Sequence, residues 1–262
     1  NTLTRRETAQ VIEKGLTVGG KSLKDHIEAT NHASAIDHIE SLIKLPVSKL
    51  GSKDILKIHE IILKGIDDGN AGRYRNVAVR ISGSAVILPN PRKVRQMMDE
   101  FVSWLVSAKK IHPVELAAQA HYKLVTIHPF VDGNGRSARL LMNLILMIHG
   151  YPPAIIRKSD RIAYLSALEM AQLGGSIEQY NKIIFKAVER SLDIYIDAAK
   201  GKSNMKGLDN DELLKIGQLA KLSGETIATI RYWTKEGLLR VVEITESGYR
   251  IYSYAAIKRC QE

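Results

Sequence analysis

The sequence predicts a mainly α-helical protein that ends in a second, much smaller domain. Apolar residues recur at helical spacing over most of residues 1–200, and strand-like alternation is confined there to one short stretch. A polar, glycine-containing segment without periodicity then follows. We therefore expect a helical domain over residues 1–200, a linker over 201–211 and a small domain over 212–262.

The first three helices are each predicted by a capping residue followed by an apolar stripe. Thr4-x-x-Glu7 has the form of a capping box, and it would open a helix that ends near Lys14. Ser22 and Ser52 are expected to cap the next two helices. The second stripe is Leu23, Ile27, Ala33, Ile36, Ile39 and Leu42, and the third is Ile55, Ile58, Ile61 and Ile62.

The stretch after the third helix predicts a small hairpin. Val77, Val79 and Ile81 alternate with Ala78 and Arg80, which is the period of a strand, and Ser82-Gly83-Ser84 is a turn sequence. We expect a β-hairpin over residues 74–88.

Four further helices are predicted from residues that are typical of helix starts and helix ends. Asn90-Pro91 and His112-Pro113 each predict a helix start, with proline at the first helical position. Ser159-Asp160 is expected to cap a helix that ends near Leu173, and Ser176 begins one that ends near Ala199.

Polar chemistry is concentrated between two apolar helix patterns, in the segment HPFVDGNGRSAR at residues 128–139. It predicts a loop with a new helix starting near Asn134, where backbone N–H groups and the helix dipole favour an anion. Gly133 and Gly135 permit the backbone angles that direct successive N–H groups at one anion.

Several side chains of this segment suit a reaction at a phosphate. A histidine such as His128 deprotonates a hydroxyl near neutral pH, and Asp132 is a hard oxygen ligand for Mg²⁺. Asn134 adds a side-chain donor, while Arg136 and Arg139 share a helix face and suit phosphates. The combination indicates transfer of a phosphate-containing group from a nucleotide to a hydroxyl.

His121 stands seven residues before His128, but no third ligand cluster accompanies the pair. We therefore interpret His121 as structural and not as a zinc ligand.

Composition limits the classes of protein to consider. The single cysteine excludes an internal disulfide and suits a reducing compartment, so we expect a cytoplasmic protein. No apolar run is long enough for a membrane span and no signal peptide is recognisable.

The net charge is +10, yet residues 208–262 are neutral, with eight basic and eight acidic side chains. The basic surface of residues 1–207 fits a polyphosphate ligand or an acidic partner as well as it fits DNA.

The segment at 128–139 resembles the signature of the Fic domain family, H-x-F-x-[D/E]-G-N-G-R-x-x-R, and every fixed position is present. The resemblance extends over most of residues 1–200, including 16–26, 72–81 and 139–158. It implies a Fic-type helical domain that transfers AMP from ATP to a Ser, Thr or Tyr hydroxyl of a protein and releases pyrophosphate.

The resemblance also assigns roles. His128 would be the general base, Asp132 would hold Mg²⁺ at the α and β phosphates, and Phe130 would be a buried anchor. The hairpin at 74–88 resembles the family's flap, which pairs with the target segment as an added strand. The flap residues at its centre are Val79, Arg80 and Ile81.

The nucleotide would lie on the turn and on the helix that follows it. By the same resemblance, Asn134 and the backbone of residues 133–136 would cradle the α and β phosphates. Arg136 would bind the β phosphate and Arg139 the γ phosphate. A kinase-like branch of the family has lysine at the first motif glycine, so Gly133 favours AMP transfer. Tyr164 resembles the adenine-side tyrosine, although Leu165 stands where a second tyrosine is common.

Regulation is implied by the N-terminus. Many relatives are autoinhibited by a helix bearing [S/T]-x-x-x-E-[G/N], whose glutamate pairs with the second motif arginine. Asn1-Thr2-Leu3-Thr4 resembles what directly follows that pattern. We expect such a glutamate two residues ahead of Asn1, with Arg139 as its partner, and its presence would keep the removal of AMP from a protein possible.

The C-terminal region predicts a winged helix-turn-helix. Residues 216–239 fit two helices around Ser223-Gly224, and residues 241–252 alternate around Ser247-Gly248 as a wing would. The sequences IRYW and ESGYRIYS resemble the MerR family, whose second helix enters the DNA major groove. The matching contacts would be Arg231, Tyr232, Lys235 and Arg250. Docking of a protein stays an alternative to DNA binding, because the region is neutral. In addition, MerR proteins dimerise through a long helix after the wing, whereas this chain ends at Glu262.

The sequence as a whole therefore predicts a protein adenylyltransferase that depends on Mg²⁺ and ATP. De-AMPylation of a protein and a nucleotide-responsive DNA-binding regulator are the alternatives, and the intact His128 argues against the regulator. A homodimer through the N-terminal helices is expected by family analogy alone.

Overall fold

The computed structural model describes residues 3, 5–15, 17–157, 159–199, 214–244, 250–253 and 255–260 of the chain. The chain divides into two compact units, Asn1–Asp193 and Ile194–Glu262. The predicted linker over 201–211 lies outside the described residues, so the predicted domain limits stay a prediction. In the described part of the chain, no helix is long and apolar enough to cross a membrane.

The first unit is a helical bundle. Its helices are α1 (Arg5–Lys14), α2 (Leu23–Leu42), α3 (Ser52–Leu63), α4 (Pro91–Ser107), α5 (Pro113–Ile127), α6 (Asn134–Ile148), α7 (Arg161–Gln172) and most of α8 (Glu178–Ala199), with a short 3₁₀ turn, η1 (Val47–Lys49). The mainly α fold class is thus confirmed.

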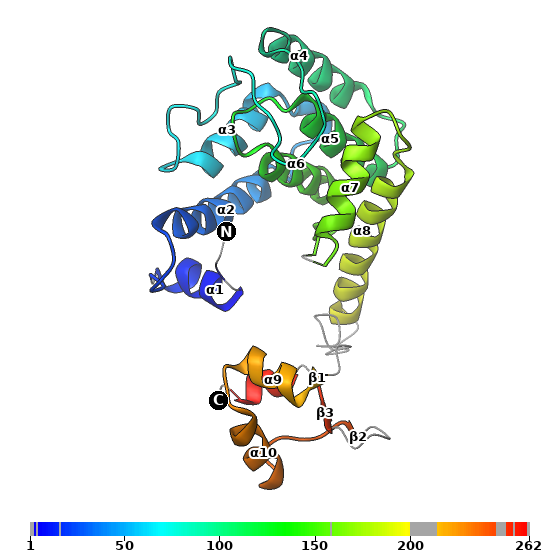
Figure 1. Cartoon of the computed structure of the whole chain (residues 1–262). Helices are drawn as coiled ribbons and strands as arrows, with labels where there is room; N and C mark the ends of the chain where they lie inside the picture. Colours follow the sequence, from blue (N-terminus) through cyan, green and yellow to red (C-terminus); the bar gives the residue numbers. More distant parts are fainter. Residues whose placement is uncertain are drawn as a thin grey trace. The chain divides into compact units, whose positions relative to one another are not determined.

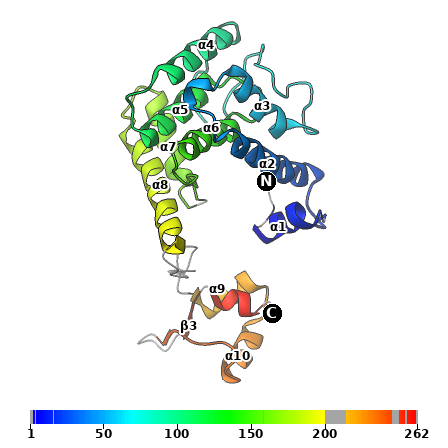
Figure 2. The same cartoon turned by 180° about the vertical axis from the view of Figure 1, so that it is seen from behind.

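Helices α5 and α6 lie at the centre of this unit. Figures 1 and 2 show them side by side, with α2 and α3 on one flank and α7 and α8 on the other. Buried apolar side chains from these helices and from α4 form one continuous core. The polar segment 128–139 covers the loop between α5 and α6 and the first turns of α6, so these two central helices hold it in place.

The helix starts follow the predicted caps in most cases. The Ser22 side chain accepts a hydrogen bond from the Asp25 N–H at 3.1 Å, and that of Asn90 accepts one from Arg92 N–H at 2.9 Å. Ser52 is not a cap: the N-cap is Gly51, and the Asp54 carboxylate accepts its N–H at 2.8 Å. The predicted hydroxyl cap was wrong because the carboxylate three residues on satisfies the helix start instead.

A second cap differs at α7. Asp160 occupies the N-cap position but makes no side-chain capping bond. Its carboxylate instead accepts from the Arg190 guanidinium of α8 at 2.7 Å. A charge-assisted bond between helices has therefore replaced the local cap.

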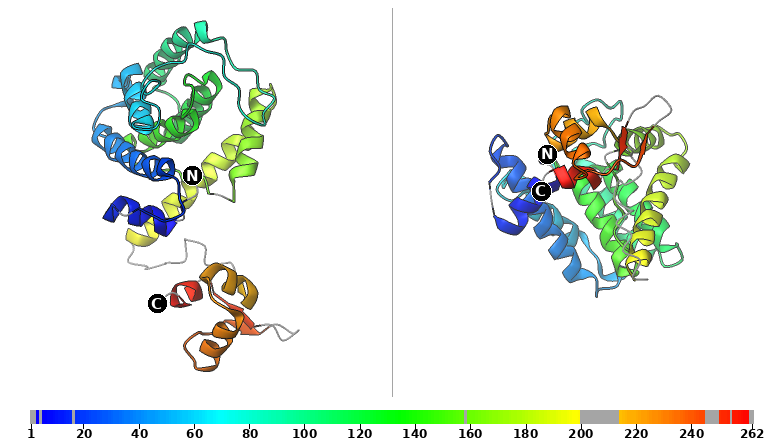
Figure 3. Two further views of the ribbon diagram at one scale, coloured as in Figure 1. Left: turned by 60° about the vertical axis from the view of Figure 1, so that its left-hand side comes forward. Right: turned by 90° about the horizontal axis from the view of Figure 1, so that it is seen from below.

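The predicted hairpin is the main correction. Residues 73–90, all of which the structure describes, contain no β-strand, and the long connection between α3 and α4 runs as an extended chain with a turn (Figure 3). The turn is in the expected place, since the Ser84 N–H donates to the Ile81 carbonyl at 3.2 Å. Alternating side chains predict extended backbone but not cross-strand pairing, and an isolated two-stranded hairpin is marginal in water.

The second unit is a helix-turn-helix beside a small sheet. Helices α9 (Ile216–Ser223) and α10 (Ile227–Lys235) flank Gly224, which closes α9 with a positive φ of 79°. Strands β2 (Glu243–Ile244) and β3 (Arg250–Tyr252) pair antiparallel as the predicted wing. The tip of the wing, with Ser247-Gly248, lies outside the described residues.

Two elements of this unit were not predicted. Strand β1 (Leu214–Lys215) pairs with β3, giving the sheet order β1-β3-β2, and α11 (Ala255–Cys260) follows the wing. Leu214, Ala256 and Cys260 are buried with Leu219 and Ile230 in a small separate core. These elements are too short to show a period in the sequence.

Candidate active site

The loop between α5 and α6 begins at a strained residue. His128 closes α5 with φ 51° and ψ 58°, and it is the only non-glycine residue of positive φ in the described part of the chain. The left-handed region costs an ordinary residue about 1–2 kcal/mol, so surrounding contacts must hold it. One of them is local, since Nδ1 of His128 donates to the Val125 carbonyl at 3.1 Å. The lone pair of the neutral ring is therefore on Nε2.

A buried arginine holds the carbonyl side of the same residue. Arg75 is 3 % exposed, and its Nε donates to the His128 carbonyl at 2.7 Å. Its two terminal nitrogens donate to the carbonyls of Val77 at 3.0 Å and Pro89 at 2.7 Å. The Arg75 N–H donates to the Pro129 carbonyl at 2.8 Å. One side chain thus joins the reactive loop to both ends of the predicted flap.

Asn134 fixes the middle of the loop. Its Oδ1 accepts from the Phe130 N–H and its Nδ2 donates to the Phe130 carbonyl, both at 2.9 Å. The residue is 3 % exposed, and these two bonds brace the turn. The predicted role of Asn134 as a donor to a phosphate stays a prediction, since its Nδ2 has a second N–H.

His59 of α3 packs under the loop. Its ring stacks on Phe130 with centroids 3.6 Å apart, its Nε2 donates to the Asp132 carbonyl at 3.0 Å, and its Nδ1 accepts from the Gly72 N–H at 3.1 Å. Burial lowers the pKa of His59 to about 4, so the ring is neutral at pH 7 and both bonds keep their direction.

Gly133 suits the turn into α6. Its φ is +78°, and an added Cβ would lie 3.2 Å from the His59 ring. A side chain would therefore combine a strained backbone with a tight contact. The glycine places the N-terminus of α6, with its free N–H groups, directly after Asp132.

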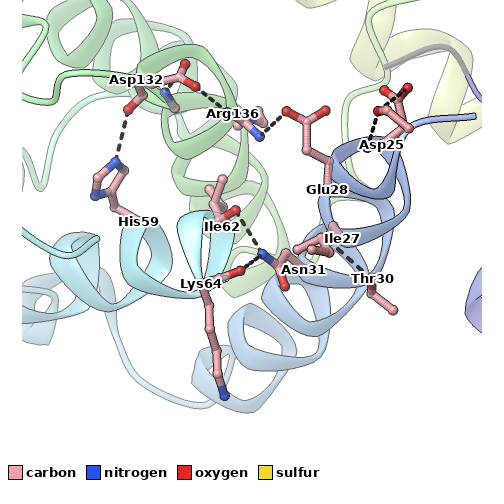
Figure 4. A network of polar contacts seen from close by, with 12 residues as sticks. Asp25, Ile27, Glu28, Thr30, Asn31, His59, Ile62, Lys64, Asp132 and Arg136 are labelled. Atoms are coloured by element: carbon pink, nitrogen blue, oxygen red, sulfur yellow. Dashed lines mark hydrogen bonds and ion pairs between the residues drawn. The ribbon is translucent and has the colours of Figure 1, made fainter. Parts of the chain in front are cut away.

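A chain of charges links this loop to α2 (Figure 4). The Arg136 guanidinium donates to Asp132 Oδ2 through NH2 and to Glu28 Oε1 through NH1, each at 3.1 Å. The Asp132 side chain is 58 % exposed, whereas those of Arg136 and Glu28 are 22 % and 18 % exposed. Asp132 thus presents a half-exposed carboxylate at the rim, whose other oxygen, Oδ1, accepts the Gly133 N–H at 2.6 Å, and Arg136 lies between two acids.

The predicted residues surround one pocket of about 690 Å³. His128, Asp132, Gly133, Asn134, Gly135, Arg136, Arg139 and Tyr164 all line it. Its wall also carries Arg80, Arg157 and Arg161, so five arginines stand against a single carboxylate, Asp132. Such a lining favours a ligand with several negative charges.

The flap reaches the pocket with two of its three predicted residues. Arg80 and Ile81 line it, whereas Val79 does not. The flap tip is held from α7, because Glu169 Oε1 accepts from the Ser84 hydroxyl and the Ala85 N–H, both at 2.8 Å. These two bonds lower the pKa of the Glu169 carboxyl. The extended flap is therefore fixed by side chains at its base and at its tip.

Tyr164 closes one wall from within the core. It is 4 % exposed, and its hydroxyl lies 3.0 Å from His121 Nε2, while Tyr180 bonds His121 Nδ1 at 2.8 Å. Burial raises the pKa of the Tyr164 phenol, and neighbouring Arg139 opposes that shift. His121 is fully buried in this cluster with a pKa lowered by burial to about 3, which fits the predicted structural role. Leu165, 46 % exposed, is the more open neighbour of the pocket.

The environment of His128 favours the neutral base. Burial lowers the pKa of His128 most, and the positive Arg75 lowers it further, while the bond to Val125 and the charge of Asp132 raise it. The resulting pKa of His128 lies below its ordinary value, so the ring is neutral at pH 7 and Nε2 can accept a proton.

The donor set fits a metal that arrives with a nucleotide. The described residues contain no cluster of three or more His, Cys, Asp or Glu side chains that could hold an ion by themselves. Mg²⁺ is commonly held by one or two carboxylates together with phosphates, and Asp132 is a half-exposed carboxylate at an anion-binding helix start.

In the second unit, the four predicted contact residues are all exposed. Arg231, Tyr232 and Lys235 lie on α10, and Arg250 opens β3. Buried Ile230 anchors the opposite side of α10.

Four supporting residues were not found from the sequence: Arg75, His59, Glu169 and Glu28. His59 gave a weak signal, since it is a polar residue inside the apolar stripe of α3. Glu28 gave none, because 108 positions separate it from Arg136.

Comparison with known families matches both units. The Fic/DOC family matches residues 49–146, and the MerR family of regulatory proteins matches residues 215–252. A protein named protein adenylyltransferase Fic from Aedes aegypti is 39 % identical over 206 residues, which cover 78 % of this chain and 41 % of that protein. The chain thus spans less than half of the curated relatives it matches.

Solved structures agree. Fic-1 (residues 134–508) from C. elegans superposes with a TM-score of 0.71 at 36 % identity, covering 78 % of this chain and 60 % of that one. A Fic domain containing signaling protein from Bacteroides thetaiotaomicron superposes with a TM-score of 0.68 at 29 % identity, covering 77 % and 83 %.

Proposed function

The chain carries a Fic domain, and on that premise we propose that it is a protein adenylyltransferase, which moves AMP from ATP to a Ser, Thr or Tyr hydroxyl of a protein. The observation that carries the proposal is the state of His128. Its Nδ1 is fixed on Val125 and its lowered pKa leaves Nε2 unprotonated beside an anion-binding helix start. His128 and the N-terminus of α6 line the same pocket, which supports the roles of base and phosphate site proposed for them.

The reaction follows from that arrangement. The target hydroxyl gives its proton to Nε2 of His128 as its oxygen attacks the α phosphorus. A new O–P bond forms, the bond from the α phosphorus to the bridging oxygen breaks, and pyrophosphate leaves. Neutral His128 is ready for this step without first losing a proton.

The phosphates are assigned to the start of α6. The N–H groups that follow Gly133 and the positive end of the helix dipole favour the α and β phosphates. Arg136 is assigned to the β phosphate and Arg139 to the γ phosphate, and both line the pocket. The Asn134 side chain is assigned beside them, because its Nδ2 keeps a second N–H after the bond to the Phe130 carbonyl.

Asp132 is assigned to Mg²⁺ bound with ATP. When bound, the ion would neutralise phosphate charge and favour departure of pyrophosphate. Asp132 suits this role since its carboxylate is half-exposed at the pocket rim.

The target is assigned to the flap. Arg80 and Ile81 face the pocket while Ile87 is 94 % exposed, so an extended segment has open backbone and an apolar side chain to bind. Addition of a strand would use backbone bonds and would tolerate several target sequences.

Incubation with α-labelled ATP and Mg²⁺ tests the function. We expect label on protein with the native chain and its loss with His128→Ala. The variant His128→Asn, which also lacks the base but tolerates the left-handed backbone, separates chemistry from loop distortion. Label that persists in both variants would refute the assigned base.

DNA binding by the second unit is a second candidate function, supported by the exposed Arg231, Tyr232 and Lys235 on α10 of a helix-turn-helix. A shift of duplex DNA that weakens with salt and is lost in Arg231→Ala/Lys235→Ala would support it, and no shift at low salt would favour protein docking. De-AMPylation, the glutamate ahead of Asn1, a homodimer and a cytoplasmic location stay predictions.

A further inference from the structure

Arg136 is held from outside the reactive loop. Its NH1 donates to Glu28 on α2, and its NH2 donates to Asp132 on the loop (Figure 4). The two acids differ in setting, because the Glu28 side chain is 18 % exposed and that of Asp132 is 58 % exposed. The more enclosed contact loses less to water and salt, so it is the firmer of the two.

The helix that carries Glu28 is itself tied to the loop. Asn31 of α2 donates through Nδ2 to the carbonyls of Ile62 at 3.1 Å and Lys64 at 2.7 Å, at the end of α3. His59 on α3 then donates to the Asp132 carbonyl at 3.0 Å. Glu28 and Asp132 are thus held in register by a closed set of contacts through α2, α3 and the loop, as Figure 4 shows.

The two arms of the Arg136 guanidinium are its terminal nitrogens, NH1 on Glu28 and NH2 on Asp132, and they are expected to behave differently when a nucleotide binds. Asp132 is the carboxylate assigned to the metal, whereas Glu28 is not among the residues that line the pocket. The arm on Asp132 is therefore the one that a phosphate would take over, and the arm on Glu28 is the one that would stay.

We propose that Glu28 is a positioning residue that fixes the Arg136 guanidinium so that its other arm meets the β phosphate, an inference that rests on the proposed function. An arginine side chain without a fixed contact samples many rotamers, and ordering it on a ligand costs conformational entropy. The fixed arm removes much of that cost before the nucleotide binds, which is preorganisation of the site.

The proposed role of Glu28 predicts the direction in which nucleotide affinity changes when its carboxylate is removed. A carboxylate that only competed with phosphate for Arg136 would weaken binding, and its removal would tighten the nucleotide. A carboxylate that positions Arg136 strengthens binding, and its removal loosens any nucleotide with a β phosphate. AMP, which has none, is the internal reference.

The test measures equilibrium binding of ATP, ADP and AMP, each with Mg²⁺, by calorimetry. Glu28→Leu removes both charge and acceptor, and Glu28→Gln keeps an acceptor oxygen. Asp37→Asn removes an exposed charge from the same helix and serves as the matched control. We expect Glu28→Leu to weaken ADP and ATP about five-fold, Glu28→Gln to weaken them less, and AMP to change little.

A ligand-free measurement accompanies it. A double-mutant cycle of Glu28→Gln and Arg136→Gln in urea unfolding is expected to show coupling between the two side chains, with none for Asp37→Asn and Arg136→Gln.

The outcomes separate the two proposals. Failure of the native chain to bind any adenine nucleotide would count against the proposed function and would remove the role of Glu28 with it. Normal binding by the native chain with unchanged or tighter ADP binding in Glu28→Leu would overturn the inference alone. Equal loss of AMP and ADP would also overturn it, since that pattern marks a general structural defect.

Discussion

At the scale of the residue, His128 joins a strained backbone to a tuned side chain. The left-handed φ of 51° turns the chain from α5 toward Gly133, and Arg75 holds the carbonyl that this turn exposes. The same arginine adds to the burial that lowers the pKa of His128. The backbone geometry and the protonation state of His128 thus both depend on Arg75.

The first prediction is the pH dependence of AMP transfer. Because the pKa of His128 lies below 6.5, the acid limb of kcat/KM is expected below that value. Arg75→Met removes a positive charge and is expected to move the limb to higher pH as well as to lower kcat. The measurement is a kcat/KM profile from pH 5 to 8, and a limb well above pH 7 would contradict the assignment.

The second prediction concerns stability in acid. The unfolded His59 takes up a proton near pH 6.5 but the folded residue only near pH 4, since burial lowers its pKa. Between these values the unfolded state binds more protons, so the free energy of unfolding falls as pH falls. His59→Gln should lose less stability between pH 7 and pH 5 than the native chain, by on the order of 1–2 kcal/mol. Equal losses in urea titrations of both proteins would show that His59 does not titrate differently in the folded state.

Sequence alone predicted the reactive residues better than their supports. The segment 128–139 is contiguous, so residue types and spacing were enough to select residues that line one pocket. The bonds of the Asn134 side chain to Phe130 within the loop were not predicted. Arg75, Glu169 and Glu28 act across long separations in the chain, and no local pattern indicates which distant backbone or side chain they meet.

At the scale of the element, the flap is an extended chain held by side chains. Arg75 binds both of its ends and Glu169 binds its tip. Its backbone has no partner strand within residues 73–90, which leaves backbone groups for the added strand of the proposed target. The alternation of Val77, Val79 and Ile81 predicted a strand, whereas the structure has a bend at Val77 and no strand in this segment.

The third prediction concerns the flap tip. Glu169→Ala removes the acceptor for the Ser84 hydroxyl and the Ala85 N–H, so amide exchange at Ala85 should accelerate at least several-fold. The KM for the target protein should rise while Mg·ATP binding stays unchanged, because Glu169 lies outside the pocket lining. Glu189→Ala, which removes an exposed carboxylate on α8, is the control. A rise in the dissociation constant of ATP with no change at Ala85 would contradict this account.

Helices were more predictable than strands for a physical reason. A helix of three or more turns carries several repeats of its apolar period, and most cap positions add a second signal. The strands of the second unit are two or three residues long, and β1 precedes α9 without any break. Their pairing depends on tertiary contacts with β3, which the local sequence does not encode.

At the scale of the whole molecule, two compact units each have their own core. The net charge of +10 lies in residues 1–207, the region that carries the pocket with five arginines. The net positive charge and the arginine-lined pocket thus occur in the same part of the sequence, whereas residues 208–262 are neutral and offer exposed side chains on α10.

The small core of the second unit has one chemical property that the first unit lacks. It contains Cys260, the only cysteine of the chain, which is 5 % exposed and has a pKa raised by burial. A maleimide or a disulfide reagent can therefore reach a thiol only when this unit opens, and its rate of reaction measures that opening in the intact protein. Partners of the second unit should slow the labelling, and nucleotides bound by the first unit should leave it unchanged if the two units open independently. The buried cysteine is thus a built-in reporter, which distinguishes events in one unit from events in the other without any added probe.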